Sequence, residues 1–388
     1  MDTYLHGVGH TPFGRHTARL DTLAIEAFER MHGEAEEALP EPGHVVVSSQ
    51  FPGEYGGVEN AAAAVTDGLG LAGLAATRVE SGPSSGLAAL EIADALIRSG
   101  ARDTVLVVGV ETMTRLPAAM ANQVLARMAT LEERKLGLTM AAQVALMTRA
   151  YLEEHGIERE LLADCAVKAH AHGLQNPLAQ FRKAVTRDEV LASGPVADPL
   201  RLYDCAPLSD GAVCLLVSRE KGPLRLGAMG HATDHLSITH RNHDARTLTS
   251  FRATTRAAEE AFGRSGWSVE DIDLIETHDA FSLLEGMNLE DLGLFERGAG
   301  VRTVAEGETA VTGKHPTNVG GGLKARGHPV GATGCAQVAE LFWQLTGHAE
   351  VEARSVERAQ GKRPKKALAH NIGGLGNNIH VALLEATA

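Results

Sequence analysis

Cysteine is scarce in this sequence, and its spacing carries no signature. The four cysteines, Cys165, Cys205, Cys214 and Cys335, never occur as C-x-x-C. A disulfide framework or a zinc cage of thiolates needs closely paired cysteines, so neither is predicted, and no metal site is expected. We expect each thiol to be a small, buried, apolar side chain.

Long apolar runs and dense blocks of positive charge are also missing. No stretch approaches the ~20 residues of a membrane-spanning helix, and the opening MDTYLHGVGH lacks the basic and apolar parts of a signal peptide. The 36 basic and 49 acidic residues give a net charge of −13. We therefore expect a cytoplasmic protein with neither nucleic acid nor membrane as its partner.

Aromatic residues make up only 4% of the chain, whereas there are 42 glycines and 44% hydrophobic residues. This composition favours an α/β protein with close backbone packing over an aromatic-rich binding module. A chain of 388 residues is too long for one small core, so two domains or a duplicated architecture are expected.

A repeat in the sequence supports duplication. Residues 86–100 predict a helix that is followed by a buried strand at 104–110, and residues 331–347 repeat the pattern before the β-rich segment from 365. We expect one half at 1–222 and a second at 223–388. Residues 113–205, with two amphipathic helices and a proline-rich stretch, are expected to form an inserted helical and loop subdomain.

The glycine-rich stretch NVGGGLKARGHPVGATG, residues 318–334, is the strongest chemical signal. It presents His328 just before a predicted helix, whose positive end favours the neutral imidazole that a general base requires. The alternative is a structural turn with a hydrogen-bonded histidine.

Two further stretches could stabilise an oxyanion. In ETHDAFSLLEG, His278 follows a short β-like run and could hold a water or donate to an oxygen; alternatively, Asp279 caps the next helix and His278 is packed. In HNIGGLGNN, the amides of Gly373 and Gly374 could point at an oxyanion, or the segment is a tight turn.

Other histidines are weaker candidates. His170 and His172 lie two residues apart in KAHAHG, without an evident third ligand. A metal ion needs at least three protein ligands in most sites, so we expect these two on a solvated helix surface.

Four stretches, NVGGGLKARGHPVGATG, HDAFSLLEGMNLEDLGL, ADPLRLYDCAPLSDGA and HNIGGLG, together resemble the thiolase superfamily, specifically thiolases of the sterol carrier protein type. The resemblance extends over nearly the whole chain. It implies an α/β thiolase fold with five αβαβα layers, two similar halves, a loop domain inserted in the first half, and a homodimer.

The resemblance also implies a chemistry, which is acyl transfer at carbon. A cysteine at the start of a buried helix takes the acyl group from coenzyme A, and the Gly-His-Pro histidine activates it. The matching positions here are His328 as base, His278 as the residue that holds the water of one oxyanion hole, and Gly373 as a backbone amide of the other; Asn318 is a further catalytic position.

Two reactive positions depart from the family pattern. The nucleophile pattern Val-Glu-x-x-Cys-x-Ser-Gly falls on residues 79–86, where the cysteine is Pro83, and the second cysteine falls on Ala280. Proline has neither a nucleophile nor an N–H, so the usual covalent intermediate is lost there. Ser84, with His328 as its base, is a candidate replacement.

The predicted function is a thiolase-type acyltransferase that acts on acyl-coenzyme A thioesters and forms or cleaves carbon–carbon bonds without a further cofactor. Arg182 and Lys183 are candidate contacts for the coenzyme A phosphates, or a solvated basic turn. One alternative is non-covalent retro-aldol cleavage or a related lyase reaction. Another is a non-catalytic subunit of an acyltransferase complex with a small zinc-ribbon and OB-fold partner.

Overall fold

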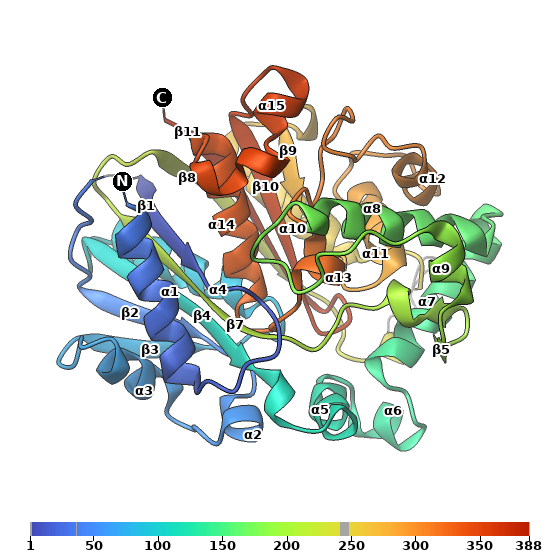
Figure 1. The fold of residues 1–388 in the computed structure, drawn as a ribbon, viewed down its shortest axis with the longest axis horizontal. Coiled ribbons are helices and arrows are strands. Elements are labelled where there is room, and N and C mark those ends of the chain that lie inside the picture. Colours follow the sequence, from blue (N-terminus) through green and yellow to red (C-terminus); the bar gives the residue numbers. More distant parts are fainter. Residues whose placement is uncertain (1, 36, 241–247, 388) are drawn as a thin grey trace.

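The computed structural model describes residues 2–35, 37–240 and 248–387. Its centre is a nine-stranded sheet in the order β3-β2-β4-β7-β1-β8-β11-β10-β9 (Figure 1). A short hairpin of β5 and β6 stands apart from it. The strands are β1 Thr3–His10, β2 His44–Ser48, β3 Ala75–Val79, β4 Thr104–Thr112, β5 Pro195–Ala197, β6 Leu200–Arg201, β7 Asp210–Ser218, β8 Leu224–Thr233, β9 Leu274–Glu276, β10 Lys366–Gly373 and β11 Asn378–Ala386.

Strand pairing repeats from one half to the other. In the first half β1 is antiparallel to β7, β7 is antiparallel to β4, and β4 is parallel to β2. In the second half β8, β11, β10 and β9 pair in the same sequence of directions. The two half-sheets join where Thr3–Leu5 of β1 pairs with Leu224–Leu226 of β8. The predicted duplication is therefore confirmed, and the half-sheets are continuous over three residue pairs.

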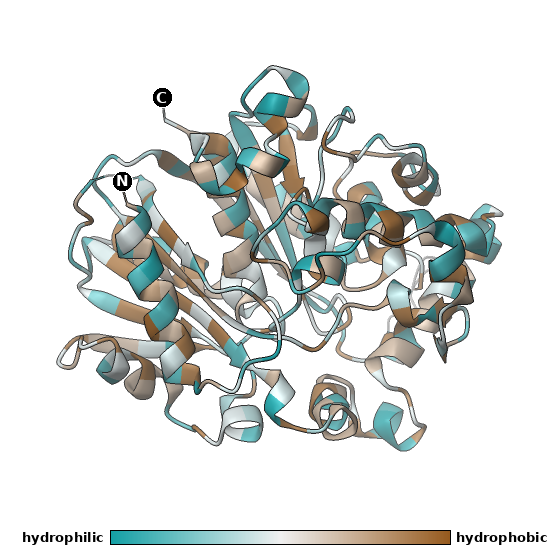
Figure 2. Cartoon of the chain, in the orientation of Figure 1, coloured by the Kyte–Doolittle hydropathy of each residue, from teal (hydrophilic) through white to brown (hydrophobic). Residues whose placement is uncertain are grey.

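Helices α4 Ser85–Arg98 and α14 Thr333–Thr346 lie between the half-sheets, while α1 Leu20–Glu34 and α10 Arg252–Ser265 cover outer faces (Figure 1). Every residue from Thr333 to Leu345 is buried, as expected for a helix enclosed on all sides. The outer helix α1 instead alternates hydrophilic and hydrophobic residues along its length (Figure 2).

Glycine allows the two central helices to touch at their first turns. A Cβ atom built on Gly86 would lie 2.6 Å from the backbone nitrogen of Cys335, and one on Gly334 would lie 2.6 Å from that of Leu87. Neither backbone can move away inside the core, so a side chain at either position would force the helices apart.

The segment between β4 and β7 is helical and crosses onto the other half. Its helix α8 Leu162–Leu174 contacts α11 Ser282–Asp291, α12 Gly300–Ala305 and α13 Gly322–Arg326 of the C-terminal half (Figure 1).

The remaining helices are α2 Pro52–Gly56, α3 Ala61–Gly68, α5 Ala118–Leu125, α6 Leu131–Lys135, α7 Met140–His155, α9 Arg187–Ala192 and α15 Val356–Gln360. No helix in the described part of the chain has the length and apolarity needed to span a membrane.

The expectation that His170 and His172 lie on a solvated surface is wrong. Both are buried in α8, and their Nδ1 atoms bond to the carbonyls of Lys183 and Asn318, at 3.1 and 3.0 Å. The helix packs against the second half, so the face that looked solvated in isolation is covered by tertiary contact. His172 thereby ties the inserted segment to the loop that carries Asn318.

Candidate active site

His328 follows α13 in the loop that leads to α14. Its backbone N–H donates to Ser209 Oγ at 2.9 Å, and its Nδ1 lies 2.8 Å from Thr333 Oγ1. The Thr333 hydroxyl donates its one proton to the carbonyl of Pro329 at 2.9 Å, so it accepts from His328 Nδ1–H. This network assigns the His328 proton to Nδ1 and leaves Nε2 with a free lone pair.

His278 lies between β9 and α11 and has the opposite arrangement. Asn371 Nδ2 lies 2.9 Å from His278 Nδ1 and donates to it, and Asn371 comes from β10. With Nδ1 as the acceptor, the proton of His278 is on Nε2. His278 is therefore a hydrogen-bond donor at the nitrogen where His328 is an acceptor.

The two imidazoles lie edge to face, with ring centroids 5.0 Å apart and an interplanar angle of 86°. Burial lowers the pKa of His328 to about 4, and burial together with His328 and His370 holds the pKa of His278 well below its usual range. Both rings are neutral at pH 7, so together they offer one proton acceptor and one proton donor.

Asn318 positions the segment that carries His278. It has a left-handed backbone with φ 55°, and its Oδ1 accepts from the backbone N–H of Thr277 at 2.9 Å. It therefore fixes the residue that precedes His278. Its buried Nδ2 has no hydrogen-bond partner among the described residues.

Two buried ion pairs fix the loop before His328, and sequence reasoning missed both. Asp279 accepts from Leu323 N at 2.6 Å and pairs with Lys324 at 3.1 Å, and Arg326 pairs with Glu276 at 3.1 Å. Asp279 therefore caps α13. The alternative from the sequence, in which Asp279 caps the next helix along the chain, α11, is wrong. The sequence did contain a signal for these ion pairs, because Lys324 and Arg326 are charged residues inside a motif that otherwise consists mostly of small residues.

Pro83 lies in the tight turn that precedes α4, packed against the end of β10. A Cβ atom built on Gly82 would lie 3.2 Å from Gly373 Cα, and one built on Gly373 would lie 2.3 Å from the carbonyl oxygen of Ser81. A cavity of about 510 Å³ borders this turn, and its lining includes Ser81, Gly82, Gly373 and Gly374. Gly373 therefore lies beside the Pro83 turn, as the motif match requires.

Ser84 does not hydrogen-bond to His328. Its Oγ donates to the carbonyl of Asn371 at 3.2 Å and lies 2.7 Å from His380 Nδ1. His380 in turn lies 3.2 Å from Glu91 through Nε2. Motif spacing could not indicate His380, because strand pairing brings it to Ser84 from 296 residues away. Glu91 lies on α4, the helix that Ser84 precedes, and the helical repeat brings it near.

The thiols are poor candidates for catalysis. Cys165, Cys214 and Cys335 are buried as expected, while Cys205 is only partly buried. Burial raises the pKa of Cys165, Cys205 and Cys335 to about 12. A protonated thiol is a weak nucleophile, so none of these three acts as a reactive thiolate at neutral pH.

Arg182 and Lys183 are exposed on a segment that is fastened to the His328 loop. The backbone N–H groups of Gln180 and Phe181 donate to the carbonyls of Arg326 and Ala325, both at 3.0 Å. The structure therefore places both cations next to the loop that carries the base.

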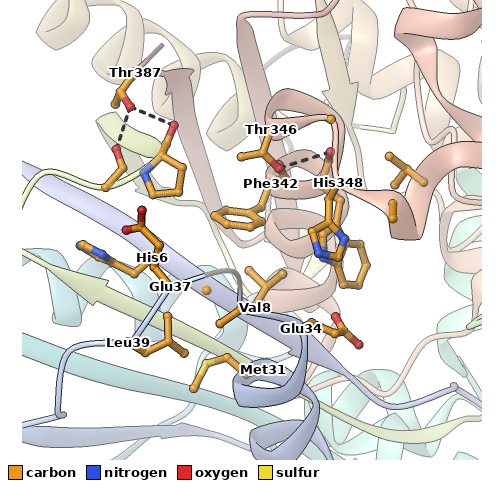
Figure 3. A pocket seen from close by; sticks show the side chains of 18 of the residues that line it. His6, Val8, Met31, Glu34, Glu37, Leu39, Phe342, Thr346, His348 and Thr387 are labelled. Atoms are coloured by element: carbon orange, nitrogen blue, oxygen red, sulfur yellow. Dashed lines mark hydrogen bonds between the residues drawn. The ribbon is translucent and has the colours of Figure 1, made fainter.

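A second cavity, of about 800 Å³, lies elsewhere, between β1, the end of α1 and the end of α14 (Figure 3). Its lining includes His6, Met31, Phe342 and His348, and does not include His278 or His328. The lining of the smaller cavity does not include His278 or His328 either, and of the predicted site residues only Gly373 and its neighbour Gly374 line it.

Comparisons with known proteins identify the family of the chain. Residues 7–221 match the thiolase N-terminal domain, and residues 230–386 match the family described as thiolase C-terminal domain-like. The acetyl-CoA acetyltransferase of Methanothermobacter thermautotrophicus is 39% identical over 331 residues, 83% of each chain. Sterol carrier protein 2 of Gallus gallus is 32% identical over 98% of this chain and 71% of its own. In fold, the Ltp2-ChsH2(DUF35) aldolase aligns with a TM-score of 0.79 at 21% identity, covering 99% of this chain and 98% of that one.

Proposed function

Since this chain belongs to the thiolase family, we propose that it makes or breaks a carbon–carbon bond next to the thioester of an acyl-coenzyme A. The observation that carries the proposal is the facing pair of imidazoles, with an acceptor Nε2 on His328 and a donor Nε2–H on His278. The name of one relative, acetyl-CoA acetyltransferase, supports the substrate class.

In the condensation direction, His328 Nε2 removes a proton from the α-carbon of the bound thioester. The electron pair of that C–H bond forms an enolate, whose oxygen is stabilised by the N–H of His278. The enolate carbon then attacks the carbonyl of the second substrate, and the His328 imidazolium returns the proton to the alkoxide or to the leaving thiolate. Cleavage of the carbon–carbon bond follows the same steps in the reverse order.

The proposed reaction involves no acyl group on residue 83. Pro83 lacks a nucleophile, and Ser84 directs its hydroxyl to the carbonyl of Asn371. This favours direct attack on a free carbonyl, as in aldol chemistry, over a covalent acyl-enzyme. The name of the structural neighbour, an aldolase, points the same way.

Covalent acyl transfer through Ser84 is a second candidate, favoured by the 2.7 Å contact between its Oγ and His380 Nδ1. The hydroxyl proton would have to turn from Asn371 to His380, whose other nitrogen faces Glu91 as in a serine–histidine–carboxylate triad. Ser84 and His380 are both almost fully buried, so the acyl carbon would need to reach them through the Pro83 turn.

Arg182 and Lys183 are proposed to contact the coenzyme A phosphates, since both are exposed beside the His328 loop. We also propose that the working form is a homodimer. A small zinc-ribbon and OB-fold partner is proposed to complete the assembly, since the name of the structural neighbour includes a second component, ChsH2(DUF35).

Deuterium exchange tests the proposal whatever the second substrate is. Acetyl-coenzyme A and a longer acyl-coenzyme A are incubated in D₂O with the wild type, His328→Gln, His278→Ala, Ser84→Ala and, as a control imidazole on an exposed helix face, His32→Ala. We expect exchange at the α-carbon with the wild type, His32→Ala and Ser84→Ala. The exchange rate should fall at least ~100-fold in His328→Gln and His278→Ala. Absence of exchange, with and without a partner, would refute enolate chemistry.

Intact-protein mass spectrometry of the same mixtures separates the two mechanisms. A stable acyl adduct that maps to Ser84 and vanishes in Ser84→Ala would establish the covalent candidate in place of the proposal. Neither exchange nor adduct, with the thioester still bound, would identify a non-catalytic subunit.

A further inference from the structure

Three side chains that the proposed enolate reaction does not use meet where α4 lies against β8 and β11; two of them, His380 and Glu91, belong to the covalent second candidate. His231 and His380 are directly opposite each other in the antiparallel pair, and their rings stack with centroids 3.8 Å apart. Glu91 reaches both from α4, with Oε2 3.4 Å from His231 Nδ1 and 3.2 Å from His380 Nε2. The three atoms all lie within 4.8 Å of one another.

The second nitrogen of each ring is already bonded to another residue. His231 Nε2 lies 2.7 Å from Asn378 Oδ1, which is an acceptor, so this nitrogen carries the proton. Ser84 Oγ donates to Asn371 and therefore accepts from His380 Nδ1–H. By this network both nitrogens that face Glu91 are lone pairs when the two rings are neutral.

Two imidazole nitrogens and a carboxylate oxygen thus converge, and with neutral rings none of the three atoms supplies a proton to the others. His380 Nε2 is buried, on a side chain that is 1% exposed, and it has no hydrogen-bond partner in the described part of the chain. Acceptors that face one another repel unless a cation lies between them. We propose that Glu91, His231 and His380 bind a divalent first-row metal ion, with Zn²⁺ as the preferred occupant.

The spacing fits this ion. Zinc binds imidazole nitrogen and carboxylate oxygen at ~2.0 to 2.2 Å, which places neighbouring ligand atoms of a tetrahedron about 3.3 Å apart. The two distances to Glu91 Oε2, 3.2 and 3.4 Å, agree with that edge. Two imidazoles with one carboxylate are a donor set suited to zinc and unlike the all-oxygen shell of magnesium or calcium.

The surroundings also resemble those of bound metals. Each histidine has its remaining N–H held by an acceptor, which fixes the ring and is the usual outer shell of a metal-ligating histidine. The Glu91 and His231 side chains are 33% and 36% exposed, so an ion can enter and keep a water as its fourth ligand.

The metal ion would bind α4 of the first half to β8 and β11 of the second. It would also hold His380 against Ser84, directly behind the Pro83 turn.

Metal binding to the chain alone tests the proposal. The purified full-length protein is stripped with a chelator and titrated with ZnCl₂, and Co²⁺ serves as a spectroscopic probe because a tetrahedral site gives strong visible absorption. The variants are His231→Ala and Glu91→Gln, which lie at the partly exposed side of the cluster, with His32→Ala as the matched control. Circular dichroism confirms that each variant is folded.

We expect one equivalent of Zn²⁺ on the wild type and on His32→Ala, with a rise in Tm on binding. His231→Ala and Glu91→Gln should each bind at least ~100-fold more weakly, since loss of a ligand costs more than loss of an outer-shell partner. Absence of tight binding to the wild type, or equal binding by all four proteins, would overturn the site and leave a proton-bridged ion pair.

Discussion

The pKa of His328 gives the sharpest quantitative prediction. Burial lowers it to about 4, although Asp279 opposes the shift. A lowered pKa means that the neutral base persists into acid: at pH 5 about 90% of His328 stays neutral, whereas a histidine at ~6.5 would be only about 3% neutral. The proposed proton abstraction should therefore retain most of its pH 8 rate at pH 5 and decline only near pH 4.

The assay is the pH dependence of kcat/KM for α-proton exchange between pH 5 and 8, which reports the free enzyme. Glu111 is the main confounder, because burial raises its pKa to about 7 while it accepts from Gly331 N in the His328 loop. If kcat/KM declines near pH 7 in the wild type and this decline disappears in Glu111→Gln, the decline is due to the Glu111 carboxyl. A limb near pH 6.5 that persists in Glu111→Gln, with an approximately 30-fold loss by pH 5, would refute a buried, neutral His328 as the base.

Three further predictions concern stability. Gly86→Ala should lower the free energy of unfolding in urea by about 1–3 kcal/mol, because the new Cβ would clash with the Cys335 backbone. Gly263→Ala in α10, where the added Cβ meets open space, should raise it by about 0.5–1 kcal/mol. Equal effects of the two substitutions would contradict the packing argument. Asp279→Asn should cost about 3–5 kcal/mol, since it strands buried Lys324; a loss below about 1 kcal/mol would show that the pair is dispensable. Burial lowers the pKa of His370 to about 3. The stability that its neutral form contributes is therefore complete above pH ~6.5 and is lost as the pH is lowered, so the free energy of unfolding should decrease by about 2 kcal/mol between pH 8 and pH 5. His370→Gln should lack that pH-dependent loss, and unfolding curves with the same pH dependence in both proteins would rule out a buried neutral His370.

Local pattern determined much of this protein. The apolar run at 104–110 predicted β4, which extends to Thr112, and the helices predicted over 86–100 and 331–347 correspond to α4 Ser85–Arg98 and α14 Thr333–Thr346, within two residues at each end. Glycine spacing marked the His328 loop, because only glycine permits the approach of one backbone to another. These features depend on residues close together in the chain, and so periodicity and composition were sufficient.

Tertiary structure alone decided how the side chains are used. The proton positions on His328 and His278 depend on Thr333 and Asn371, and the cluster of Glu91, His231 and His380 joins a helix of one half to two strands of the other. Ser84 is an example: the motif suggested His328 as its base, but packing placed it against His380. Sequence spacing determines which element a residue occupies, whereas its partner is set by how the two half-sheets enclose the central helices.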